Sequence, residues 1–252
     1  MITAQQITQF CDELLHANEF KDYCPNGLQV DADTPITKII TGVTACQALI
    51  DRAVQENAQA ILVHHGYFWK GESQPLVGIK GKRIRMLLQH GISLIAYHLP
   101  LDAHPVYGNN ALLADKLGLT IVGALYPDEK LPIGNIATCS PIKAIDFAKK
   151  ICETLGREPL YLGDNPDRML QKIALCTGAA QDMIEQAHQM GCDGFISGEV
   201  SERTTHMARE LGVDYFGAGH HATEKGGIIA LGEQVAKHFD VECVFVDIDN
   251  PV

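Results

Sequence analysis

Hydrophobic and polar positions follow two periods along the chain, one typical of helices and the other of short buried strands. Residues 3–18 carry apolar side chains at spacings of three and four, which predicts an amphipathic first helix. Thr3 and Gln6 form a T-x-x-Q pattern, which predicts a capping box at the start of this helix. The apolar stripe consists of Ile7, Phe10, Cys11, Leu14 and Leu15.

Short apolar runs farther along the chain predict strands, and most of them are followed by a helical pattern. The strands are expected at residues 38–43, 60–63, 92–97, 133–139, 172–176, 194–196, 214–218 and 242–246. The helices are expected at residues 45–57, 82–90, 108–117, 142–155, 181–190, 201–211 and about 224–238. Strands that alternate with helices of this length predict an α/β fold.

Turn residues divide these elements and indicate where the domains end. Residues 24–30, 67–81 and 157–168 are predicted to be loops because glycine, proline and other turn residues gather there. The pattern weakens over residues 119–135, where Pro127 and Pro132 flank a charged stretch, and we expect a domain boundary there. The first domain would comprise residues 1–127 and about 222–252, and the second residues 128–221.

The two parts of the chain repeat one order of features. Thr41-Gly42 is followed by alternating helices and strands that end in His98-x-x-x-Asp102. Thr177-Gly178 is followed by the same order of elements, which ends in His220-x-x-x-Glu224. The repeat predicts two similar α/β domains, with the last strand returning to the first.

Composition and charge exclude several classes of protein. The 252 residues include 31 Asp and Glu against 20 Lys and Arg, a formal net charge of -11, which disfavours nonspecific binding to nucleic acid. No apolar run approaches 18 residues, and MITAQQITQF lacks the pattern of a signal peptide, so no membrane association is expected. The eight cysteines form no CxxC pair. We therefore expect a cytoplasmic protein with reduced thiols.

Candidate chemistry gathers where three predicted strands end. His64 and His65 follow the first, His98 and Asp102 the second, and His220 and Glu224 the third. Ligands of α/β sheets collect beyond the carboxyl ends of strands. Imidazole and carboxylate groups suit Fe, Mn, Zn or Ni, and a carboxylate can link two ions.

A structural role is the alternative explanation for these residues. A single histidine at a strand end is more often a hydrogen-bonded polar residue than a ligand. Three such clusters together favour a site. Glu199 occupies the position that matches His64-His65 in the repeat, and either a cleft position or a surface position fits it.

Five separated motifs resemble the Nif-three-like family, often called GTP cyclohydrolase I type 2 homologues, in its short bacterial form. The motifs are PNGLQV (25–30), ILVHHGYFW (61–69), AYHLPLD (96–102), ISGE (196–199) and GAGHHATEKGG (217–227). The resemblance implies two similar α/β domains with a metal-binding cleft between them and a toroidal homohexamer. It implies two divalent metal ions per chain, held by His64, His65, Asp102, His220 and Glu224.

The resemblance and the residues leave two functions open. The first is a dinuclear-metal-dependent hydrolase of a nucleotide or similar small molecule, including ring opening of GTP by metal-activated water. In that hypothesis His98 and Glu199 assist proton transfer, and Asn26 lines the substrate cleft. The second is a ring-shaped metal-binding regulatory or interaction protein without turnover. No P-loop or Rossmann glycine pattern supplies a triphosphate cradle.

Overall fold

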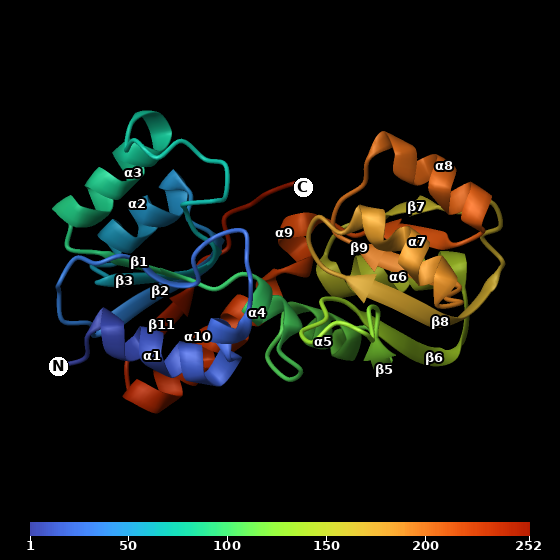
Figure 1. Ribbon diagram of the computed structural model, residues 1–252, viewed down its shortest axis with the longest axis horizontal. Helices are drawn as coiled ribbons and strands as arrows, with labels where there is room; N and C mark the ends of the chain where they lie inside the picture. Colours follow the sequence, from blue (N-terminus) through green and yellow to red (C-terminus); the bar gives the residue numbers. More distant parts are fainter. The chain divides into compact units, whose positions relative to one another are not determined.

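The computed structural model describes residues 1–252, which divide into two α/β units (Figure 1). Unit 1 comprises Met1–Leu101 and Gly227–Asp249, and unit 2 comprises Asp102–Gly226 and Asn250–Val252. The predicted fold of two α/β domains is confirmed, because each unit contains its own mixed sheet and its own cores.

The sheet of unit 1 has five strands in the order β1-β4-β3-β2-β11. Its strands are β1 (Gly27–Val30), β2 (Lys38–Thr44), β3 (Ala60–His65), β4 (Ser93–Ala96) and β11 (Glu242–Phe245). All neighbours are parallel except β1, which pairs with β4 in the antiparallel direction. The last strand therefore lies beside β2 and extends the sheet of the first unit.

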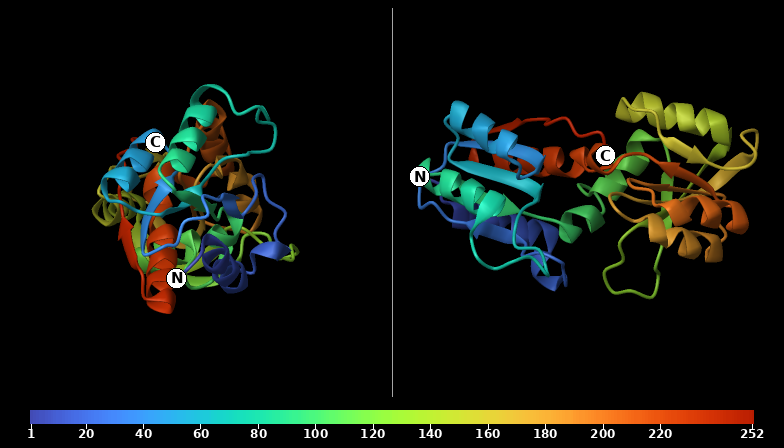
Figure 2. Two further views of the ribbon diagram at one scale, coloured as in Figure 1. Left: turned by 90° about the vertical axis from the view of Figure 1, so that its left-hand side faces the viewer. Right: turned by 90° about the horizontal axis from the view of Figure 1, so that it is seen from above.

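Helices cover both faces of this sheet, which explains why its strands read as continuous apolar runs. On one face α1 (Ala4–Leu15) and α10 (Lys225–Phe239) pack through residues such as Ile7 and Leu231. On the other face α2 (Gln47–Gln55) and α3 (Gly78–Gln89) pack through residues such as Leu49 and Leu87 (Figures 1 and 2). The predicted capping box at Thr3 and Gln6 is present in α1.

The sheet of unit 2 has six strands in the order β5-β6-β8-β9-β10-β7. Its strands are β5 (Thr120–Ala124), β6 (Asn135–Lys143), β7 (Leu160–Leu162), β8 (Met169–Cys176), β9 (Gly194–Ser197) and β10 (Asp214–Gly217). The central strands β8, β9 and β10 are parallel, and the outer pairings are antiparallel. The carboxyl ends of the parallel strands thus share one edge of the sheet.

Unit 2 is also layered as helix, sheet and helix. One core includes Leu113 of α5 (Asn109–Lys116) and Phe147 of α6 (Ala144–Leu155). The other includes Ile184 of α7 (Ile184–Gln189) and Ala208 of α8 (Glu202–Leu211). Two further short helices, α4 (Leu99–Ala103) and α9 (His220–Thr223), and 3-10 turns at Ala17–Glu19 and Gln181–Met183 complete the elements.

The chain divides after Leu101, whereas the sequence pattern predicts a boundary near residue 127. Pro127 and Pro132 lie in the connection of the β5–β6 hairpin inside unit 2, so their turn signal marks a hairpin and not a linker. The return to unit 1 falls at Gly227, close to the expected residue 222. Strands β1, β5 and β7 and helix α4 are additions to the predicted elements.

No helix combines the length and the apolar character that crossing a membrane requires. The structure describes all eight cysteines as free thiols. Burial raises the pKa of several of them, for example Cys24 to about 12, so these thiols act as small apolar groups and not as nucleophiles.

Candidate metal centre

Three imidazoles gather in unit 1 at the carboxyl ends of β3 and β4. His64 and His65 are the last residues of β3, and His98 follows β4. The ring centroid of His64 lies 4.5 Å from that of His65 and 5.2 Å from that of His98. One ring nitrogen from each residue lies within 4.8 Å of the other two, so the three could hold a metal ion.

His64 is fully buried, and its tautomer is fixed by the backbone. Its Nδ1 lies 2.8 Å from the carbonyl oxygen of Tyr97, which can only accept a hydrogen bond. Nδ1 therefore carries the proton and Nε2 carries the lone pair that a metal needs. Tyr97 is itself anchored, because its hydroxyl lies 2.7 Å from Oδ1 of Asp12.

The turn after His65 depends on close packing against strand β1. The side chain of Gln29 donates to the carbonyl of Pro25 at 2.8 Å and accepts from the backbone N–H of Tyr67 at 2.6 Å. A Cβ at Gly66 would collide with this side chain. The glycine that follows the two histidines is thus required by the packing of the PNGLQV motif against the turn.

His98 is held by a buried carboxylate. Asp22 accepts a hydrogen bond from Nδ1 of His98 at 2.7 Å, and its side chain is 2% exposed. Asn26 donates to Asp22 at 2.9 Å, and its Oδ1 accepts from the backbone N–H of His98 at 2.8 Å. Asn26, the expected substrate residue, therefore braces both members of this pair. The ring of Trp69 packs against His98 in a T-shaped arrangement, with the two ring centroids 4.9 Å apart.

A carboxylate and its partners form the first part of the cluster in unit 2. Asp102 is 5% exposed, and its Oδ1 accepts from Nδ2 of Asn109 at 2.9 Å and from Oγ1 of Thr177 at 3.3 Å. Asn110 donates to the backbone carbonyl of Asp102 at 3.1 Å and accepts from the backbone N–H of Thr177 at 2.9 Å. These contacts fix the carboxylate beside the end of β8.

His220 lies between two carboxylates at the start of α9. Its Nδ1 is 2.7 Å from Oε1 of Glu199, and its Nε2 is 3.1 Å from Oε2 of Glu224. Burial lowers the pKa of His220, but the hydrogen bonds and charges of Glu224 and Glu199 outweigh burial and raise this pKa to about 9. Gly178 makes room for the arrangement, because a Cβ there would collide with Oε1 of Glu224.

The structure thus places the predicted site residues in two clusters, each within one unit. Unit 1 holds His64, His65, His98 and Asn26, and unit 2 holds Asp102, Glu199, His220 and Glu224. Imidazoles with Nδ1 occupied and buried carboxylates form a nitrogen and oxygen donor set, which fits Fe, Mn, Zn or Ni. The sequence alone does not single out Asp22, Gln29 and Asn109. Asp22 lies in a loop, Gln29 in the short edge strand β1 and Asn109 at the first position of α5, and hydrophobic periodicity marks none of these polar positions.

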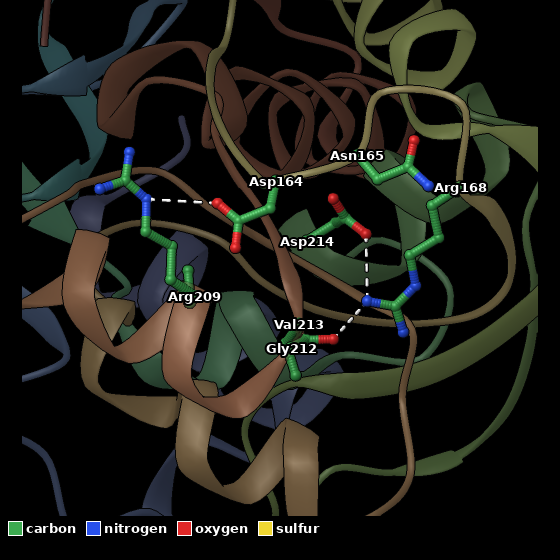
Figure 3. A pocket seen from close by; sticks show the side chains of 9 residues that line it. Asp164, Asn165, Arg168, Arg209, Gly212, Val213 and Asp214 are labelled. Atoms are coloured by element: carbon green, nitrogen blue, oxygen red, sulfur yellow. Dashed lines mark hydrogen bonds and ion pairs between the residues drawn. The ribbon is translucent and has the colours of Figure 1, made fainter.

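A separate cavity of about 90 Å³ lies at the amino end of β10, whereas His220 lies beyond its carboxyl end (Figure 3). The charged groups that line it pair with one another: Arg168 lies 3.3 Å from the buried Asp214, and Arg209 lies 3.5 Å from Asp164. Burial raises the pKa of Asp214 despite the hydroxyl of Tyr161 and the charge of Arg168. These ion pairs stabilise the walls of the cavity, and the cavity is separate from the two histidine clusters.

The fold and the two clusters together define an α/β protein with candidate metal-binding residues at the ends of its strands. The chain belongs to the Duf34/NIF3 (NGG1p interacting factor 3) family, whose sequence profile matches residues 2–251.

Similar proteins cover the whole chain. A Haemophilus influenzae protein named "GTP cyclohydrolase 1 type 2 homolog" is 51% identical over 251 residues, which is 98% of each chain. A Vibrio cholerae protein of the same name is 48% identical over 250 residues, also 98% of each. A solved structure described as "protein ybgI, unknown function" covers 100% of both chains with a TM-score of 0.95 and 46% identity. These names agree with the resemblance that the sequence motifs carry.

Proposed function

We propose that the chain is a metal-dependent hydrolase of a nucleotide or a similar small molecule, with two divalent ions of Fe, Zn, Mn or Ni. The proposed ligands are those that the resemblance implies, namely His64, His65, Asp102, His220 and Glu224. Family membership and the names of the relatives support the proposal at its coarser level.

The observation that carries the proposal is the way in which the imidazoles are held. The carbonyl of Tyr97 occupies Nδ1 of His64, and the carboxylate of Glu199 occupies Nδ1 of His220. A second hydrogen bond of this kind is typical of metal-binding histidines, because it orients the ring and raises the basicity of the other nitrogen.

The donor set supports the proposed reaction class. Two divalent ions, when bound, acidify a coordinated water and offset the charge that develops on oxygen in the transition state. His98 takes the proton of the attacking water, and Glu199 orients His220 and is the second candidate for proton transfer. Asn26 and the loop over residues 67–81 border the substrate. Ring opening of GTP is the reaction that the names of the relatives suggest.

Elemental analysis joined to a nucleotide screen tests the proposal. The metal-loaded protein should contain two ions per chain and should turn over GTP or a related nucleotide. Glu224→Gln should remove turnover while leaving the fold intact, because it removes one proposed ligand charge. Glu202→Gln is the matched control, since Glu202 is an exposed residue of α8 whose side chain pairs only weakly with His206. Full metal loading without any turnover would contradict the hydrolase.

A second candidate is a metal-binding homohexameric ring with a regulatory role and no turnover. Strand β5 favours assembly, because it is an edge strand of its sheet with exposed apolar side chains, Ile121 at 37% and Val122 at 58%. In that case the main effect of Glu224→Gln would be a lower melting temperature or loss of the assembly, because the ions would stabilise structure.

A further inference from the structure

A buried and fully bonded carboxylate of unit 1, Asp22, is not part of the proposed ligand set. It belongs to the loop before β1, and four donors converge on it. Nδ1 of His98 lies at 2.7 Å, Nδ2 of Asn26 at 2.9 Å, the backbone N–H of Leu99 at 2.9 Å and its neighbour's N–H, that of Tyr23, at 2.6 Å. With both oxygens engaged, the carboxylate is fixed in position.

These donors keep Asp22 ionised despite its burial. Burial acts to raise the pKa of this carboxyl, but the hydrogen bond and charge of His98, with the bonds from Asn26 and Leu99, hold it below its usual value. An ionised carboxylate only accepts hydrogen bonds, so the proton on the imidazole of His98 is located at Nδ1. In the neutral form of the imidazole, Nε2 is then the nitrogen that can accept a proton.

The ring of His98 lies beside His64 and His65, two of the proposed ligands. The ring centroid of His98 lies 5.2 Å from that of His64 and 5.8 Å from that of His65. In unit 2 the same 2.7 Å contact joins Glu199 to Nδ1 of His220. The two units therefore repeat a carboxylate–imidazole pair after corresponding strands, but the carboxylate comes from a different element in each.

We infer that Asp22 is a positioning residue that holds His98 as the proton acceptor for the attacking water, as a buried aspartate holds the histidine of a Ser-His-Asp triad. The inference deepens the proposed hydrolase and rests on it. As the water oxygen bonds to the electrophilic carbon or phosphorus of the substrate, one water proton moves to Nε2 of His98. The resulting imidazolium is stabilised by Asp22. As the bond between the electrophilic atom and the leaving group breaks, the leaving group keeps the bonding electron pair and takes the proton from Nε2.

The first test is the tautomer of His98, which needs no substrate. In ¹H–¹⁵N correlation spectra of the metal-free protein, His98 should show a protonated Nδ1 and an unprotonated Nε2, with assignment by comparison with His98→Gln. Asp22→Asn should move the proton to Nε2, because an amide can donate to Nδ1. Asp51→Asn, which alters a carboxylate on α2 bonded to Gln47, should leave the His98 signals unchanged. A protonated Nε2 in the unaltered protein would overturn the inference even if Asp22→Asn failed to fold.

Metal content and turnover form the second test. His98→Gln and Asp22→Asn should both retain two ions per chain. Turnover should fall roughly 10²–10⁴-fold in both, because loss of a general base has effects of this size. An ion lost in His98→Gln would make His98 a ligand and refute its role as acceptor. If the unaltered protein turns over no substrate, the proposed function fails, whereas the tautomer result still decides whether Asp22 positions His98.

Discussion

Single backbone positions decide whether the clusters can form. Gly178 combines a positive φ of 70° with a site where a Cβ would collide with Oε1 of Glu224. The positive φ is unfavourable for any L-residue, whereas the collision with Glu224 is specific to the cluster. The glycine of the Thr177-Gly178 pair is therefore tied to the proposed chemistry and not only to a turn.

Gly178→Ala should destabilise the protein by more than Gly191→Ala. Gly191 has a similar φ of 68° but nothing within 4 Å of an added Cβ, so it reports the backbone strain alone. We expect about 1 kcal/mol for Gly191→Ala and a further 1–3 kcal/mol for Gly178→Ala from the collision. Urea denaturation measures both. Equal losses in the two variants would show that Glu224 moves aside at no cost.

The histidines could be predicted from the sequence, whereas several of their partners could not. His64, His65 and His220 follow short apolar runs. These runs predict buried strands, so the sequence indicates that the three histidines lie at strand ends. Asp22 lies 76 residues from His98 in the chain, in a loop without any period. Only the folded arrangement brings the pair together, and no local pattern encodes it.

At the scale of elements, the predicted strands and helices were those with strong periodicity. Strand β5 was missed because its residues TIVGA are mostly exposed, at the edge of the sheet, and so lack the pattern of a buried strand. The sequence predicts a loop where strand β1 lies, because Pro25, Asn26 and Gly27 give a turn signal at its start. Edge strands thus account for most of the missing elements.

Val122→Lys on β5 tests whether this edge is covered by a second copy of the chain. A charged residue on an exposed edge opposes strand pairing. Light scattering should show a smaller assembly for Val122→Lys than for the unaltered protein. Val106→Lys is the control, because Val106 is 59% exposed, close to the 58% of Val122, and lies outside any strand. An identical mass for all three proteins would remove β5 from the proposed interface.

At the scale of the whole molecule, the protonation of His220 couples stability to pH when metal is absent. The pKa of His220 in the folded chain is about 9, above its ordinary value of 6.5. A raised folded pKa means that the folded state binds the proton more tightly. The stabilisation is therefore fully present below pH 6.5 and is lost as the pH rises through 9.

The melting temperature of chelator-treated protein should accordingly fall between pH 6.5 and 9. Glu199→Gln should weaken this fall, because it removes one of the two carboxylates that raise the pKa of His220. Glu202→Gln should leave it unchanged, since Glu202 pairs with the exposed His206. A melting temperature that is independent of pH over this range would contradict the raised pKa.

The division of unit 1 into two chain segments has a consequence for synthesis. β11 lies beside β2, but about 200 residues separate the end of β2 at Thr44 from the start of β11 at Glu242. At 5–20 residues per second, a ribosome needs roughly 10–40 s to make this stretch. During that interval one edge of the first sheet is open, while nearly all of unit 2 has already emerged as a continuous segment. The sheet of unit 2 can therefore be complete before the sheet of unit 1. The exposed edge of β2 is where a chaperone would be needed.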